Sequence, residues 1–325
     1  MKGSFIISLD FELLWGGIEK RGPRDYGQSH VSNVPKVIDE LLCLFAKYNV
    51  HATFATVGLL MLDGKEAVKK YAPSKHPSYN NHSLSPYLNG YIDKIEERDE
   101  RLYFVPDVVK KIQMQEGMEI GTHTFCHYYC WEKGQTAYEF EADIKAAISV
   151  ADERGLKITS MVFPRNQVPK EYLRICAENG IVVYRGNPDK WFGPYKSSFE
   201  AKKSKIFRFL DYYFPIGGHN TYDINSIESE FGIYNVKASR YLRPYDKRLA
   251  LFDELKYHRI KKEMEYAAKH GQMYHLWWHP HNFGNNVAKN IAFLEKVLKV
   301  YVVCKEKYGM QSYTMTEYVN NIHNQ

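Results

Sequence analysis

Short apolar runs alternate with helical patterns along most of the chain. Apolar runs that predict buried strands lie at residues 4–9, 53–57, 118–122, 158–163, 181–185 and 273–278. Apolar side chains at helical spacing predict helices at residues 34–48, 108–115, 138–154, 170–178, 249–270 and 289–307. Because strand, helix and strand follow one another repeatedly, the pattern predicts an α/β protein with a parallel sheet.

Two segments interrupt this alternation. Residues 71–101 are rich in proline, serine, asparagine and charge, and residues 186–245 are rich in aromatic side chains. We interpret both as insertions in a single domain that spans residues 1–325. A long, weakly patterned segment of this kind is either a lid or substrate wall, or a packed excursion that only shapes the rim, and the pattern leaves both open.

Composition narrows the class of protein. With 325 residues, 44% of them hydrophobic, the chain can bury a full core, yet no apolar run approaches the roughly 20 residues of a membrane-spanning helix. Five scattered cysteines argue against a disulfide framework, and no signal-peptide cleavage pattern is evident, so we expect a cytoplasmic protein without stable membrane insertion. The net charge is +6, but the basic residues are not gathered into a basic stripe, so no nucleic-acid partner is expected. The oligomeric state is not predicted.

Polar side chains gather directly after four of the predicted strands. They are Asp10 and Glu12, the pair His123 and His127, Arg165, and His279. In a parallel α/β barrel the carboxyl ends of all strands open on one face, where active sites are built from several loops. Residues remote in sequence are therefore expected to converge there.

The two histidines of the segment HTFCH are four residues apart. This spacing places His123 and His127 on one face of a helical turn, as two adjacent nitrogen ligands of a divalent metal require. With 13 histidines in the chain the pair alone is weak evidence, because ordinary partly buried histidines give the same pattern. Cys126 and Cys130 share the segment, but four ligands from one helical segment cannot readily surround one ion, so we interpret them as packing residues.

The other strand ends supply acid, base and cation. Asp10 and Glu12 point to the same side of an extended strand, so one can bind a metal while the other acts as a base; the alternative is a solvated strand end or a helix cap. Arg165 can hold a carboxylate in its ionised form, unless it is a surface loop arginine. His279 ends a strand with apolar neighbours that can perturb its pKa, while His275 lies further down the strand and His281 in the following loop.

Taken together, these residues make the chain resemble the polysaccharide deacetylase family, the carbohydrate esterases that share the NodB homology domain. The resemblance covers about residues 4–282 and rests on four segments in the family's order, SLDFE, HTFCH, FPRNQ and LWWHPH. It implies a distorted, TIM-like (β/α)7 barrel and a divalent metal, commonly zinc, with cobalt, manganese or nickel as alternatives. The Asn-Gln-Val that follows Arg165 departs from the family pattern.

The resemblance also implies roles for individual residues. Asp10 is the expected general base, Arg165 orients it, His279 is the general acid, and the metal ligands are Glu12, His123 and His127. The residues expected to contact the substrate are Trp191, Trp278 and His281.

The function implied is metal-dependent removal of an N-acetyl group from an amino sugar of a glycan or glycan precursor. Because no export signal is evident, the expected substrate is a carrier-linked or nascent glycan of surface polysaccharide biosynthesis. One alternative is hydrolysis of a small amide or cyclic imide on the same scaffold. Another is a catalytically inactive glycan-binding protein, against which the full set of ionisable residues argues.

Overall fold

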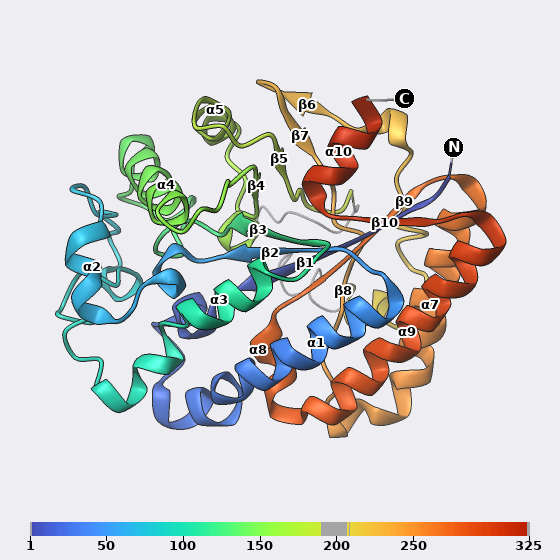
Figure 1. Cartoon of the computed structure of the whole chain (residues 1–325), viewed down its shortest axis with the longest axis horizontal. Coiled ribbons are helices and arrows are strands. Elements are labelled where there is room, and N and C mark those ends of the chain that lie inside the picture. The colour runs from blue at the N-terminus through green and yellow to red at the C-terminus, as the bar shows by residue number, and fades with distance from the viewer. Residues whose placement is uncertain (1, 190–206, 208, 324–325) are drawn as a thin grey trace.

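A single curled sheet forms the centre of the protein, as a computed structural model shows (Figure 1). The structure describes residues 2–189, 207 and 209–323. Within them the strands are β1 (Ser4–Phe11), β2 (Ala52–Thr56), β3 (Met118–Thr122), β4 (Ser160–Met161), β5 (Val183–Tyr184), β6 (Ser229–Glu230), β7 (Ile233–Asn235), β8 (Arg240–Tyr241), β9 (Met273–Trp278) and β10 (Gln311–Tyr313). Their order in the sheet is β6-β7-β5-β4-β3-β2-β1-β9-β8, with β10 beside the start of β1.

One extended stretch closes the sheet into a barrel. β7 pairs in parallel with β5, and the N–H of Val236 and of Ala238 continue that pairing onto the carbonyls of Tyr184 and Gly186. The N–H of Ser239 then bonds the carbonyl of His275, where β8 begins to pair with β9. β7 and β8 therefore act together as one strand of the barrel, which joins β5 to β9. The predicted distorted (β/α)7 barrel is confirmed.

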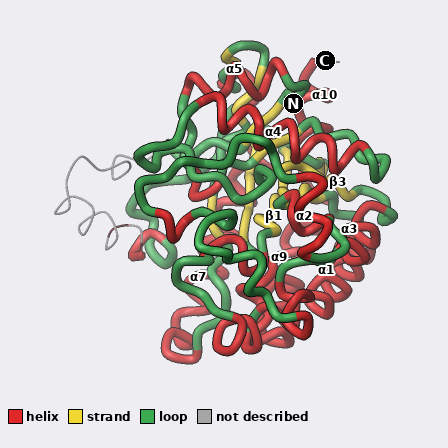
Figure 2. Tube along the Cα trace, turned by 90° about the vertical axis from the view of Figure 1, so that its left-hand side faces the viewer, coloured by secondary structure: helices red, strands yellow, loops and turns green. Residues whose placement is uncertain are grey.

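Helices surround this barrel. They are α1 (Val34–Tyr48), α2 (Lys65–Tyr71), α3 (Pro106–Gln113), α4 (Ala137–Asp152), α5 (Lys170–Glu178), α7 (Asp253–His270), α8 (Pro280–Phe283), α9 (Val287–Tyr308) and α10 (Met315–His323). In Figure 1, α3, α1, α9 and α7 lie below the sheet and α4 and α5 above it, and Figure 2 shows the strands enclosed by helices and loops. None of the described helices combines the length and apolar character needed to cross a bilayer.

Strand alternation divides the core in two. On β1, Phe5, Ile7, Leu9 and Phe11 face outward into the large core beneath the helices. The inward positions carry Ile6, then Ser8 and Asp10, all buried. Around Ile6, inward side chains from other strands pack against α10 through Met315, Tyr318 and Val319. Since α10 fills this end of the barrel with apolar side chains, the polar groups are left at the other end, after Asp10.

The predicted helices at residues 34–48 and 170–178 are found with those bounds, as α1 and α5. The segment 71–101 contains only the short 3-10 turns His82–Leu84 and Glu97–Leu102 after the end of α2. Of the segment 186–245, residues 190–206 and 208 lie outside the described residues, and Trp191 is among them. Treatment of the whole chain as one domain stays a prediction.

Candidate metal centre and active site

The end of β1 delivers both acidic side chains to the barrel mouth. Asp10 and Glu12 are 3% and 4% exposed, while Phe11 between them points outward against Phe54 of β2. Two buried carboxylates require partners, because isolated ionised groups are costly to remove from water. Each carboxylate has its own set of partners.

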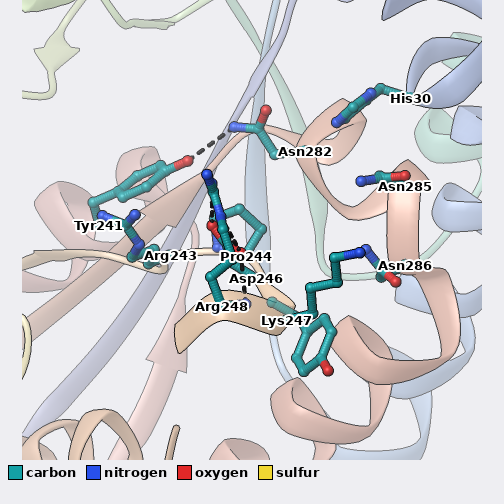
Figure 3. A pocket seen from close by; sticks show the side chains of 11 residues that line it. His30, Tyr241, Arg243, Pro244, Asp246, Lys247, Arg248, Asn282, Asn285 and Asn286 are labelled. Atoms are coloured by element: carbon teal, nitrogen blue, oxygen red, sulfur yellow. Dashed lines mark hydrogen bonds and ion pairs between the residues drawn. The ribbon is translucent and has the colours of Figure 1, made fainter. Parts of the chain in front are cut away.

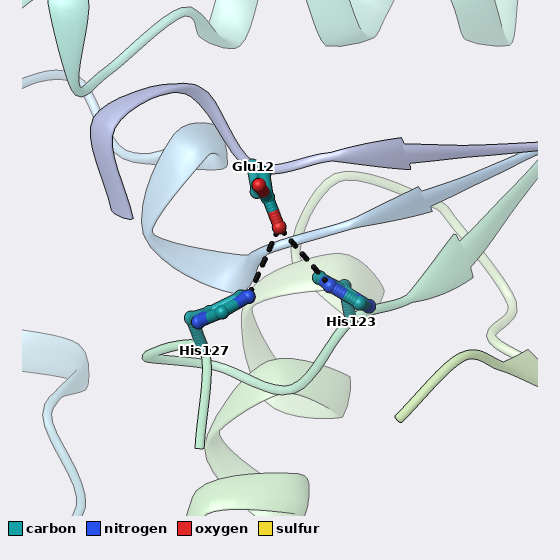
Figure 4. Close-up of side chains that lie close together, drawn as sticks. All are labelled: Glu12, His123 and His127. Atoms are coloured by element: carbon teal, nitrogen blue, oxygen red, sulfur yellow. Dashed lines mark ion pairs between the residues drawn. The ribbon is translucent and has the colours of Figure 1, made fainter. Parts of the chain in front are cut away.

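Glu12 faces the two histidines of the HTFCH segment. Oε2 of Glu12 lies 3.4 Å from Nε2 of His123 and 3.0 Å from Nε2 of His127 (Figure 4). One potential ligand atom from each of the three buried residues lies within 4.8 Å of the others. Nε2 of His123 is buried without a hydrogen-bond partner in the described structure, as expected of a nitrogen that serves a cation. One carboxylate and two imidazoles are a donor set that divalent transition metals accept, so these residues fit a metal.

The loop that carries these histidines is not helical, so the prediction that they lie on one helical turn is wrong. Thr124 and His127 both have positive φ, at 65° and 61°, which reverses the chain between the two imidazoles. Oγ1 of Thr124 accepts the N–H of Tyr128 at 2.7 Å and so closes the loop. The two rings therefore meet, with centroids 5.0 Å apart, through a hydrogen-bonded loop.

Outside the loop, two contacts fix the histidines. The carboxylate of Asp143 on α4, fully buried, accepts the N–H of Phe125 at 2.7 Å and of Cys126 at 3.2 Å. Nδ1 of His123 lies 2.7 Å from the carbonyl of Val162. Because a carbonyl only accepts, Nδ1 carries the proton and Nε2 keeps its lone pair toward Glu12.

The cysteines of the segment are core residues, as expected. Cys126 and Cys130 are buried in the main hydrophobic cluster, and burial raises the pKa of both thiols well above the ordinary range. Neither joins the potential ligand group of Glu12, His123 and His127.

Asp10 is held by an arginine that the sequence did not single out. Nη1 and Nη2 of Arg185, at the end of β5, lie 2.6 Å and 2.9 Å from the two carboxylate oxygens of Asp10. The fully buried guanidinium also donates to Oγ of Ser8 and to Oδ1 of Asn166, and lies 4.1 Å from the centre of the Trp277 ring. A bidentate, multiply braced pair of this kind fixes the direction of both oxygens.

The expectation that Arg165 orients Asp10 is therefore wrong. Arg165 has a positive φ of 54° in a tight turn, and its guanidinium points toward the rim. There it pairs with Glu19 at 2.7 Å and with Glu132 at 3.3 Å, over the ring of Tyr129. The left-handed backbone of Arg165 turns its side chain away from Asp10. Arg185 lies two residues after the inward-facing Val183, so its side chain also points into the barrel.

The surroundings keep both carboxylates ionised. Burial acts to raise the pKa of Asp10, but the positive charges of Arg185 and His279 outweigh burial and lower it. Burial also acts to raise the pKa of Glu12, but the charges of the neighbouring histidines, His279 first, lower it well below its usual range. Asp10 is thus available as a proton acceptor and Glu12 as a ligand.

His279 lies between the two carboxylates. Its Nε2 is 3.7 Å from Oδ2 of Asp10 and 3.6 Å from Oε1 of Glu12, and its side chain is 22% exposed. Nδ1 lies 3.3 Å from the amide nitrogen of Asn282, whose amide oxygen accepts from Tyr26. Nε2 is therefore the ring nitrogen that faces the site, between the two carboxylates.

The neighbours of His279 occupy different positions. His275 is buried beneath the site, where burial lowers its pKa to about 3 and its Nε2 lies 2.8 Å from Oγ of Ser8. His281 is 1% exposed, with Nε2 3.8 Å from Oε1 of Glu12, and its substrate contact stays a prediction.

The expected substrate contact of Trp278 is wrong. Trp278 is fully buried on the outer face of β9, against Phe45 and Phe283. Trp277 has the inward parity instead, and its ring lies against His279 and Tyr241. The alternation of the strand, counted from His279, is the signal that selects Trp277.

Gly16 leaves room for the Glu12 carboxylate. A Cβ on Gly16 would collide with Oε1 of Glu12, whereas a Cβ on Gly22 would meet no atom within 4 Å. We expect Gly16→Ala to displace the carboxylate and to weaken zinc binding by at least about tenfold. Losses of metal affinity of that size follow when residues that position a metal ligand are mutated. Gly22→Ala is the matched control and should bind as the wild type in a competition titration. Equal zinc affinity of the two variants would contradict this position for Glu12.

The chain is similar in sequence to one family. Residues 25–184 match the sequence model of the family described as polysaccharide deacetylase. No curated protein matches the chain.

Similarity to solved structures extends over the whole fold. A protein from Mycobacterium smegmatis described as a polysaccharide deacetylase superposes with a TM-score of 0.62 at 14% identity, covering 100% of this chain and 91% of that one. One from Pseudomonas aeruginosa PAO1, described in the same terms, gives a TM-score of 0.54 at 13% identity and covers 99% and 91%. The 4-alpha-glucanotransferase of Thermococcus litoralis gives 0.53 at 10% identity, covering 98% of this chain and 40% of that one. At these identities the likeness concerns the fold alone.

Proposed function

The chain belongs to the polysaccharide deacetylase family, and from this premise we propose that it is a metal-dependent hydrolase that removes the N-acetyl group from an amino sugar. The observation that carries the proposal is the buried group of Glu12, His123 and His127 directly beside Asp10 and His279. Amide hydrolysis requires a ligand set, an ionised base and a proton donor placed side by side.

Glu12, His123 and His127 would hold the cation, with zinc proposed and cobalt, manganese or nickel as alternatives. When bound, a divalent cation supplies Lewis-acid polarisation and makes water easier to deprotonate. The protein supplies the fixed positions of the donors. His123 is fixed by the carbonyl of Val162, and the loop by Asp143.

The protein's own residues account for the proton transfers. Asp10, ionised and held in position by Arg185, accepts a proton from the attacking water as the water oxygen bonds to the acetyl carbon. His279, as an imidazolium, donates the proton on Nε2 to the amide nitrogen as the carbon–nitrogen bond breaks and becomes a neutral imidazole, because an amide anion is too basic to leave. The products are acetate and the free amino sugar.

The substrate is proposed to be a glycan or a carrier-linked glycan precursor, with the chain acting in the cytoplasm on surface polysaccharide biosynthesis. Trp277 supports a sugar substrate, since its half-buried ring lies beside His279 and aromatic rings stack on sugar faces. Hydrolysis of a small amide or cyclic imide is the second candidate, because the same residues would serve it.

Acetate release from a panel of N-acetylated amino sugars, measured beside hydrolysis of small linear amides and a cyclic imide, tests the proposal. We expect turnover of at least one N-acetylated sugar and slower turnover of the small amides. Hydrolysis of the amides or the imide alone would replace the proposed substrate class. Sugar binding without any hydrolysis would identify an inactive glycan-binding protein.

A further inference from the structure

An open cleft of about 820 Å³ lies beside His279. Tyr241 at the end of β8 and residues 243–248 after it form one wall, and Asn282, Asn285 and Asn286, which follow β9, contribute to the other (Figure 3). Two of its lining residues connect it to the site. Asn282 donates to the hydroxyl of Tyr241 at 2.8 Å and lies 3.3 Å from Nδ1 of His279. Asn282 and Tyr241 therefore stand between His279 and this cleft, so the cleft begins one residue away from the proposed general acid.

The cleft is positively charged. Arg243, Lys247 and Arg248 line it, and Asp246 is its only carboxylate among the described residues. Asp246 is already bound by Arg248, with Nη2 2.7 Å and Nε 3.0 Å from its two oxygens. Three cations against one carboxylate leave an excess of positive charge at the cleft.

Arg243 is held without an acidic partner. Its guanidinium lies over the rings of Phe209 and Tyr212, at 5.2 Å and 5.8 Å, and no carboxylate in the described part of the chain pairs with it. Stacking on two rings restricts the side chain while its N–H donors stay available. Lys247, exposed on the same wall, likewise has no described carboxylate partner.

The opposite wall adds neutral donors. Asn285 and Asn286 line the cleft and directly precede α9, so the positive end of this long helix lies at the same wall. A neutral glycan carries no charge that could pair with these cations. Phosphoryl oxygens, in contrast, accept hydrogen bonds from arginine, lysine and amide donors together. The cleft volume is also that of a ligand site with room beyond a single sugar.

We propose that this cleft binds a phosphate group of the substrate, so that the N-acetylated sugar reaches Asp10 and His279 as a sugar phosphate or diphosphate. The inference rests on the proposed deacetylase function and narrows its substrate class. Either a nucleoside diphosphate or a prenyl diphosphate carrier would supply the same phosphate chemistry.

Calorimetric titration of the purified full chain with uridine diphosphate, geranyl diphosphate and inorganic pyrophosphate tests this site. We expect binding that weakens with ionic strength and is roughly tenfold weaker in the double variant Arg243→Gln/Lys247→Gln, since two exposed charge pairs are lost. Arg101→Gln/Lys299→Gln removes two exposed charges far from the cleft in sequence and should bind as the wild type. Tighter binding of uridine diphosphate than of pyrophosphate identifies a nucleotide carrier, and tighter binding of geranyl diphosphate a lipid carrier.

Equal binding by the wild type and the Arg243→Gln/Lys247→Gln variant overturns the inference, as does failure of the wild type to bind any of the three probes at millimolar concentration. Acetate release from neutral N-acetylated sugars without phosphate binding would keep the proposed function and reject the phosphate site. Phosphate binding that needs Arg243 and Lys247, without acetate release from any sugar, would keep the site and reject deacetylation.

Discussion

Arg185→Leu is expected to lower kcat for acetate release by at least about a hundredfold, the lower range of what a general base contributes. Without the guanidinium, burial raises the pKa of Asp10, so the carboxyl group becomes protonated and cannot accept a proton near neutral pH. The acid limb of the pH profile should accordingly move to higher pH. Arg165→Ala should change kcat less than about threefold, since its partners Glu19 and Glu132 belong neither to the group of Glu12, His123 and His127 nor to the ion pair of Asp10.

Arg185 is fully buried, so its removal also threatens folding, and leaving Asp10 unpaired costs about 3–5 kcal/mol. Arg185→Lys keeps the charge but loses the bidentate contact, and should retain a profile closer to the wild type at reduced kcat. Thermal unfolding of each variant identifies those that are folded. Folded Arg185→Leu with wild-type kcat, together with an inactive Arg165→Ala, would reverse the assignment of the two arginines.

His123→Ala is expected to abolish metal binding and turnover together. One of three buried candidate ligands is lost, so zinc affinity should fall by more than about a hundredfold. This exceeds the loss expected when only a residue that positions a ligand is mutated. A bound metal also stabilises the folded chain, by about 4 kcal/mol at a free concentration a thousand times the Kd. Zinc should therefore raise the Tm of the wild type and leave the Tm of His123→Ala unchanged.

His82→Ala is the matched control for this experiment. His82 is exposed on the short 3-10 turn His82–Leu84, and it lies outside the described potential ligand group. It should keep both the zinc-dependent Tm shift and full turnover. A zinc-dependent Tm shift that persists in His123→Ala would place the metal elsewhere in the chain.

Local patterns predicted β1 to β5, β9 and the two strand ends that carry the candidate metal ligands, but they missed β6, β7 and β8 within the segment 186–245. Helix periodicity located residues 34–48 because one apolar stripe faces the sheet, and parity after a strand placed Asp10 and Glu12 on the same side. The strands β4 and β5 are shorter than the predicted strands at residues 158–163 and 181–185, although flanking residues such as Val162 and Val182 still make backbone hydrogen bonds to neighbouring strands. The fold class predicted that the polar residues at the strand ends meet at one mouth of the barrel.

What local patterns missed depends on contacts between strands. Arg185 looked like the polar end of an apolar run, and only its inward parity with Val183, which packs inside the barrel, directs it toward Asp10. Arg165 was preferred for its position in a motif, but the positive φ of its turn sends it to the rim. Trp278 is the predicted substrate contact, but Trp277 is the residue on the inward face, because one residue along a strand changes the face.

The histidine loop shows the same limit. A spacing of four residues brings His123 and His127 together in a helix, but here it does so through positive φ at Thr124 and His127. The compensating hydrogen bonds come from Thr124 itself and from Asp143, on the following helix. Spacing therefore identified the pair, while the contacts that hold it required the structure.

Acetate release by the purified chain, stripped of metal with a chelator and then given back one equivalent of zinc, tests the central claim most directly. We expect release from an N-acetylated amino sugar to be lost on stripping and restored by about one equivalent of zinc in the wild type, but not in His123→Ala. Full acetate release by the metal-free chain, or no release from any N-acetylated sugar at any metal loading, would contradict a metal-dependent deacetylase centred on Glu12, His123 and His127.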